Sequence, residues 1–151
     1  MAKTIKVIGQ VGGGVASDPT SFDLRVKAGT AASIKPGYLV IKDGSNAGYV
    51  AAAPDATAST AEIIGIAGST STDTATADGT VQVITAPSLL VEIFAKTPAS
   101  LAATMLYDQF ILDVTSGNYT LDQATATNGI FRLISYDATT GRCIATLHTN
   151  Y

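Results

Sequence analysis

The sequence predicts a mainly β protein: a compact barrel- or sandwich-like domain with one short helix and an extended N-terminal arm. Apolar and polar residues alternate with a period of two, as at Phe22, Leu24 and Val26, which is typical of half-buried strands. Turn-forming pairs such as Asn128-Gly129 separate short apolar runs. Of the 151 residues, 46% are hydrophobic and only 14% are charged, a balance that argues against disorder.

Residues 1–20 are expected to form a flexible arm, and residues 21–151 a single β-rich domain. Ile5–Ile8 is a short apolar stretch, but three consecutive glycines and an Asp-Pro pair follow it within residues 9–19. Ordering a glycine-rich backbone costs more conformational entropy than ordering other residues. We therefore expect that deleting residues 2–17 leaves the melting temperature almost unchanged.

Ten further strands are expected from apolar runs that are bounded by turn residues. In chain order they are Phe22–Val26, Tyr38–Ile41, Tyr49–Val50, Ile63–Ile66, Val81–Ile84, Leu89–Phe94, Phe110–Val114, Tyr119–Leu121, Ile130–Ser135 and Cys143–Leu147. Residues 51–61 and 69–78 are rich in Ala, Ser and Thr and are expected to be a linker and a loop. We find no repeat of fixed period along the chain. Short strands at this spacing favour a sandwich or a barrel.

One helix is expected over residues 98–107. Thr97 is a suitable N-cap, and Pro98 occupies the favoured first position. Leu101 and Met105 then fall on one face of the helix.

The charge is unevenly distributed. Residues 1–42 carry six Lys/Arg and two acidic residues, whereas residues 43–151 carry three and ten. A basic leading segment on an acidic body is typical of docking onto an acidic surface, although on charge counting alone a surface lysine cluster is the favoured explanation. The formal net charge of −3 makes nucleic acid an improbable partner. So few charges also predict that copies of the chain or a larger partner cover part of its surface.

The residue pattern offers no constellation for catalysis, metal binding or cofactor binding. The glycines of residues 9–14 lead into a strand, whereas a phosphate-binding loop leads into a helix. Cys143 and His148, the only cysteine and histidine, fall on opposite faces of one strand, so they cannot share a metal or a proton. The carboxylates of the C-terminal half show no spacing that selects an acid–base pair; they are Asp108, Asp113 and Asp122. We expect a protein that is not an enzyme and needs no cofactor.

Membrane association and secretion are not expected either. The N-terminus lacks the apolar core of about 7–15 residues that a signal peptide has. The chain also lacks an apolar run of about 18 residues, the length that a membrane-spanning helix needs. The sequence therefore predicts a soluble protein made in the cytoplasm.

Several stretches resemble the capsid decoration (cement) proteins of tailed bacteriophages. They are Lys35–Lys42, Val50–Thr57, Ile63–Gly68, Ala77–Val83, Asp113–Asp122 and Thr125–Ile134. The resemblance covers roughly residues 35–148. It implies a β-tulip fold with a short helix, a place on the outer face of an icosahedral head, the major capsid protein as partner, and a homotrimer.

The expected function is therefore that of a virion structural protein that stabilises the head shell. Candidate interface residues are Lys3, Lys6, Val11 and Val15 in the arm, and exposed loop positions near Tyr49 and Asp73. Two alternatives stay open: another virion component, such as a tail, fibre or baseplate protein, and a non-viral β-rich module that binds carbohydrate or another ligand.

Overall fold

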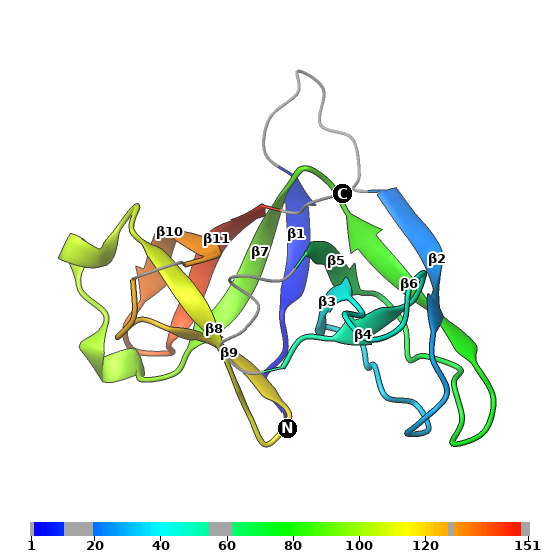
Figure 1. Cartoon of the computed structure of the whole chain (residues 1–151). Helices are drawn as coiled ribbons and strands as arrows, with labels where there is room; N and C mark the ends of the chain where they lie inside the picture. Colours follow the sequence, from blue (N-terminus) through cyan, green and yellow to red (C-terminus); the bar gives the residue numbers. More distant parts are fainter. Residues whose placement is uncertain (1, 11–19, 55–61, 127–128, 149–151) are drawn as a thin grey trace.

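The structure is a computed structural model that describes residues 2–10, 20–54, 62–126 and 129–148. Within these residues the chain is mainly β (Figure 1). The strands are β1 (Lys6–Gln10), β2 (Thr20–Val26), β3 (Leu39–Lys42), β4 (Val50–Ala52), β5 (Ile63–Ala67), β6 (Gly79–Thr85), β7 (Ser88–Ala95), β8 (Gln109–Thr115), β9 (Asn118–Asp122), β10 (Phe131–Asp137) and β11 (Arg142–His148). All ten strands expected after residue 20 are confirmed, with bounds that differ by a few residues.

The strands form two closed barrels, which confirms the barrel among the expected architectures. In the first barrel the order is β2-β4-β3-β5-β6. In the second, β7 pairs with both β11 and β9 and so closes β7, β11, β10, β8 and β9 into a ring, to which β1 is added at β7. Figure 1 shows the first barrel on the right, the second on the left and β1 between them.

Each barrel encloses apolar side chains that the period-two pattern places inward. In β6 of the first barrel, Val81 and Val83 are at most 1% exposed, while their neighbours Thr80 and Gln82 face solvent. In the second barrel Cys143 is fully buried, as expected of a small core residue.

The two barrels pack against each other through one continuous apolar cluster. Leu39 and Ile66 of the first barrel belong to the same buried cluster as Val91 and Leu121 of the second. The rings of Tyr38 and Tyr119 stack across the contact, with centroids 4.4 Å apart. The barrels are therefore joined by packed side chains and do not merely follow one another along the chain.

The expectation of a flexible arm is wrong for its first part. β1 pairs antiparallel with β7, so that Lys6 lies opposite Glu92. Just before β1, Ile5 is 2% exposed, and its N–H donates to the Gly37 carbonyl at 3.0 Å. Burial of apolar side chains and backbone pairing outweigh the entropy lost by this segment. The glycine-rich residues 11–19 lie outside the described residues.

The single helix expected over 98–107 is also wrong. The segment contains two 3-10 turns, Pro98–Ser100 and Ala103–Met105, separated by extended backbone at Leu101. Thr97 makes no side-chain capping bond, although Pro98 does begin the first turn. Leu101 is 8% exposed, so packing it into the core interrupts a helix that would be only marginally stable at this length. In the described part of the chain, nothing helical is long and apolar enough to span a bilayer.

Candidate functional site

An exposed cluster of charged and aromatic side chains lies at one end of the first barrel. Arg25 donates from Nη2 to the Tyr49 hydroxyl at 2.6 Å, and that hydroxyl donates to Asp78 Oδ2 at 2.7 Å. Lys27 Nζ lies 3.1 Å from Asp78 Oδ1. Both cations also lie over the Tyr49 ring, Arg25 Cζ at 4.4 Å and Lys27 Nζ at 5.2 Å from its centroid. We call Arg25, Lys27, Tyr49 and Asp78 the Tyr49 cluster.

Hydrogen bonds keep Asp78 ionised within this cluster. The Tyr49 hydroxyl, the Ala28 N–H and Lys27 together lower the pKa of Asp78 to about 2. The carboxylate therefore stays charged at neutral pH and holds both cations in place. Tyr and Arg side chains are enriched in protein interfaces, so the cluster is suited to contact another protein. It holds no activated nucleophile or acid–base pair.

Asp73, expected to be an exposed loop residue, is buried at 3% exposure. Its Oδ2 accepts a hydrogen bond from the Ser33 hydroxyl at 2.9 Å, and its carbonyl accepts one from the Ala32 N–H at 3.1 Å. Its other carboxyl oxygen, Oδ1, has no hydrogen-bond partner among the described residues. The exposure expected for Asp73 is therefore wrong, because its side chain links two loops at the end of the first barrel.

The candidate residues of the N-terminal segment occupy different places. Lys3 lies over the Phe94 ring at 5.6 Å, and its backbone N–H donates to Asn118 Oδ1 at 2.8 Å. Lys6 is exposed on β1. Val11 and Val15 lie outside the described residues. The structure therefore places Lys3 and Lys6 beside strands of the second barrel and the Tyr49 cluster on the first, and it does not bring the described candidates together into one site.

Sequence reasoning missed a cluster on the second barrel. Lys96 Nζ lies 2.7 Å from Asp113 Oδ1 and 3.4 Å from Asp122 Oδ2. The other Asp113 oxygen accepts hydrogen bonds from Thr115 at 3.0 Å and Thr120 at 3.4 Å. Three different strand regions meet here because β9 pairs with the end of β7. Spacing along the chain carries no signal for such a meeting.

The electrostatics of this second cluster are those of a structural ion pair. Burial raises the pKa of Asp113, but hydrogen bonds from Lys96 and Thr115 outweigh it, so the pKa is lowered overall. The hydrogen bond to Asp113 likewise raises the pKa of Lys96. Each partner therefore favours the charged form of the other, and neither is poised to exchange a proton near neutral pH.

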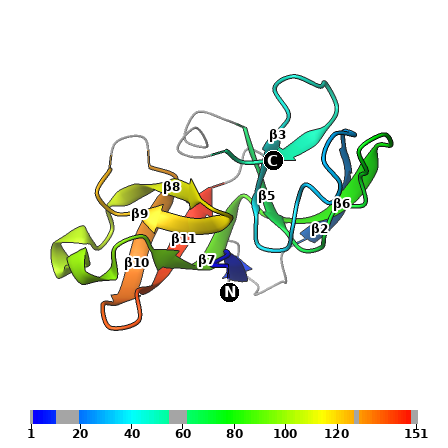
Figure 2. The same ribbon diagram turned by 90° about the horizontal axis from the view of Figure 1, so that it is seen from below.

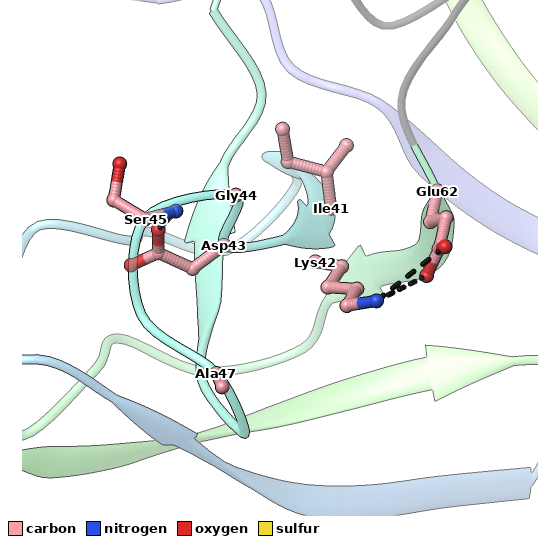
Figure 3. A pocket seen from close by; sticks show the side chains of 7 residues that line it. All are labelled: Ile41, Lys42, Asp43, Gly44, Ser45, Ala47 and Glu62. Atoms are coloured by element: carbon pink, nitrogen blue, oxygen red, sulfur yellow. Dashed lines mark hydrogen bonds and ion pairs between the residues drawn. The ribbon is translucent and has the colours of Figure 1, made fainter.

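A surface hollow of about 490 Å³ lies beside the turn between β3 and β4 (Figure 3). Lys42 and Glu62 form an exposed ion pair at its rim, with Nζ 3.3 Å from Oε2. Asp43 accepts hydrogen bonds from the Ser45 N–H at 2.8 Å and from the Asn46 amide at 2.9 Å. The Asn46 amide, together with the Ser45 N–H, lowers the pKa of Asp43. The charged and polar groups beside the hollow thus bond to one another, and the bonds to Asp43 stabilise the turn.

Across the described ranges, no three His, Cys, Asp or Glu side chains are grouped so that they could hold a metal ion. Burial raises the pKa of the Cys143 thiol to about 11, so this sulfur stays protonated and weakly reactive at neutral pH. His148 lies exposed at the end of β11. The two residues face opposite sides, as the strand pattern predicts.

Comparisons of the chain with protein-family models, with curated proteins and with solved structures found no match.

Proposed function

We propose that the protein is a structural virion protein that binds the outer surface of an icosahedral phage head and stabilises the shell lattice. One observation carries the proposal. In their described residues, the stretches that resemble capsid decoration proteins lie on strands and turns of both barrels, from β3 to β6 and from β8 to β10. The resemblance thus follows the framework of the fold. The major capsid protein is the proposed partner.

The arrangement of charges supports a role in contact rather than in chemistry. Cations of the leading segment pair with acidic residues of the body: Arg25 and Lys27 with Asp78, and Lys42 with Glu62. With only 14% charged residues in the chain, the surface outside these ion pairs is sparsely charged. A ligand that binds only the intact lattice stabilises it by about 2.7 kcal/mol per site when its free concentration is 100 times Kd.

The finer features implied by the resemblance belong to the same proposal: the β-tulip type, a homotrimer on the shell, and display on the outside of the capsid after synthesis in the host cytoplasm. The Tyr49 cluster is the proposed shell-facing patch on the first barrel, and Lys3 and Lys6 extend contact onto the second.

Co-sedimentation with phage heads that lack the protein tests the proposal. We expect purified protein to pellet with the heads up to a fixed ratio to the major capsid protein and to raise their disruption temperature. Tyr49→Ala removes the group that joins Arg25 to Asp78, and it should raise the apparent Kd at least about tenfold. Lys42→Ala is the matched control: it removes an exposed cation of the same barrel outside the patch and should bind like the wild type.

Protein that stays in the supernatant at every concentration contradicts the proposal. Labelling confined to tails in electron micrographs would instead assign the chain to a tail, fibre or baseplate.

A further inference from the structure

The second barrel repeats the strand arrangement of the first. The leading strand β2 pairs parallel with β4 and antiparallel with β6. Likewise, the leading strand β7 pairs parallel with β9 and antiparallel with β11. The remaining ladders run antiparallel in the order β4-β3-β5-β6 in the first barrel and β9-β8-β10-β11 in the second. Order and direction therefore agree for all five strands.

The residue registers agree as well. Cross-strand pairs of the first barrel have equivalents in the second. Val26–Val50 in the first barrel corresponds to Ala95–Leu121 in the second. In the same way Leu39–Ile66 corresponds to Gln109–Arg132, and Ile66–Ile84 corresponds to Arg132–Thr146. A single correspondence for each strand satisfies every ladder around both rings. By this correspondence Ile41 matches Ile111.

The turn that leads into β3 in the first barrel, and into β8 in the second, gives independent support for the repeat. Gly37 has a φ of 83° and Tyr107 a φ of 72°, both left-handed. The Gly37 N–H donates to the Ala67 carbonyl at 2.8 Å, and the Tyr107 N–H donates to the Leu133 carbonyl at 2.7 Å. Because Ala67 and Leu133 correspond in the β5 and β10 registers, Gly37 and Tyr107 occupy the same position in the two barrels.

In the first barrel, the outer face of β3 and β5 is covered. Leu39 and Ile66 on this face are at most 1% exposed, in the cluster shared with the second barrel. The N-terminal segment closes the corner at Gly37, where an added Cβ would lie 2.5 Å from the Thr4 Cβ. This face thus forms the contact between the barrels.

The corresponding face of the second barrel is open. Tyr107, at the position of Gly37, is 64% exposed, and Ile134 on β10 is 37% exposed. Arg132 matches the buried Ile66 but faces solvent, and its guanidinium donates to the Tyr107 carbonyl at 2.7 Å. In Figures 1 and 2 this side of the second barrel points away from the first. We call Tyr107, Gln109, Ile111, Arg132 and Ile134 the Tyr107 face.

We infer that the Tyr107 face is an assembly surface that takes a second copy of this chain. The internal repeat indicates what binds there. The equivalent face of the first barrel, on β3 and β5, is covered by the second barrel of the same chain. A barrel from another copy can therefore cover the Tyr107 face in the same way. In the contact between the barrels, the β3–β5 side of the first barrel meets the Tyr119 side of the second. These faces are unlike, so repeating the contact between copies gives a head-to-tail arrangement. This inference does not rest on the head-binding proposal, because it concerns the purified chain alone.

The residues of the Tyr107 face suit contacts that form between folded molecules. Its mixture of Tyr, Arg and Ile is typical of protein interfaces, whereas the purely aliphatic Leu39, Ile41 and Ile66 suit permanent burial. Tyr107 also keeps a left-handed φ that a tyrosine adopts only at a cost, where the first barrel uses glycine. The Tyr107 side chain is 64% exposed and so buries little area within its own barrel; a role outside the monomer accounts for a tyrosine at this position.

Analytical ultracentrifugation of the purified full chain between ~10 µM and ~1 mM, the range of weak and transient interfaces, tests the inference. We expect the average mass of the wild type to rise with concentration. Tyr107→Gly should raise the melting temperature by about 2–4 °C, because it relieves the φ strain, and yet weaken association at least about tenfold. Ile134→Lys should weaken association similarly. Thr80→Lys, at an exposed position of β6, should associate like the wild type.

If Tyr107→Gly raises the melting temperature and at the same time weakens association, misfolding is excluded as the cause of the weaker association. A wild-type chain that is monomeric over the whole range overturns the inference. Self-association that survives both face variants, or that Thr80→Lys abolishes equally, overturns it too.

Discussion

At the scale of single residues, Tyr119 ties the two barrels together. It is 2% exposed, stacks on Tyr38, and donates a hydrogen bond from its hydroxyl to the Ala53 carbonyl at 3.2 Å. Burial, with a smaller contribution from Tyr38, raises the pKa of the Tyr119 phenol, so the hydroxyl keeps its proton throughout the stable pH range. One side chain thus supplies both apolar area and a directed polar bond between β9 and the end of β4.

Tyr119→Phe should lower the free energy of unfolding by about 1 kcal/mol, because it leaves the Ala53 carbonyl without its donor. For a domain of this size that corresponds to a fall of about 2–4 °C in Tm, measurable by calorimetry. Tyr38→Phe is the control: it keeps the stacked ring and should stay within about 0.5 kcal/mol of the wild type. Equal losses in the two variants would show that the hydrogen bond of Tyr119 contributes nothing of its own.

The lowered pKa of Asp78 predicts how the stability of the protein changes in acid. This pKa is about 2 in the folded chain against an ordinary 3.8, so the contribution of Asp78 to stability is complete above pH 4 and is lost as the pH falls towards 2. Thermal unfolding of the wild type and Asp78→Asn from pH 7 to pH 2 should show a constant difference in Tm down to about pH 4, which then shrinks. A difference that is unchanged at pH 2 would mean that the carboxylate charge is not what the Tyr49 cluster uses.

At the scale of elements, the segment that contains β1 lies between the two barrels and contacts both. β1 pairs with β7 of the second barrel, while the residue before it, Ile5, bonds to Gly37 of the first. It therefore belongs to the contact between the barrels. The expectation that deleting residues 2–17 spares the melting temperature consequently has to be replaced.

Ile5→Ala should destabilise the protein by about 2–4 kcal/mol, because Ile5 is 2% exposed and its truncation leaves a cavity between the barrels. Ile8→Ala, in the same strand but 41% exposed, should cost no more than about 0.5 kcal/mol. Denaturant unfolding of both variants measures the contrast. If Ile5→Ala is as mild as its control, the N-terminal segment is the loose arm that the sequence suggested.

The elements could be predicted from the sequence wherever the signal was local. Alternation and turn residues located strands as short as Val50–Ala52, because the period of two is a direct consequence of strand geometry. The 98–107 helix was mispredicted because its capping signals are also local, whereas the burial of Leu101 that interrupts it is a tertiary effect. Local signals do not separate β1 from the arm for the same reason: its partner β7 begins 82 residues after β1 begins.

At the scale of the whole molecule, the chain is two barrels of one design with β1 between them. No fixed period revealed this repeat, because the connecting loops differ in length: Val26 corresponds to Ala95, but Gly79 corresponds to Gly141. Sequence reasoning found Tyr49 as a candidate contact residue and missed its partner Asp78. It also missed the Tyr107 face, because only the repeat shows that this surface matches a buried one.

The central claim, that the chain decorates a phage head, is tested most directly by counting its copies in purified particles with quantitative mass spectrometry. If the chain decorates the head, the particles contain a species of 15.4 kDa at a copy number comparable to that of the major capsid protein. A few copies per particle, or none, would contradict it.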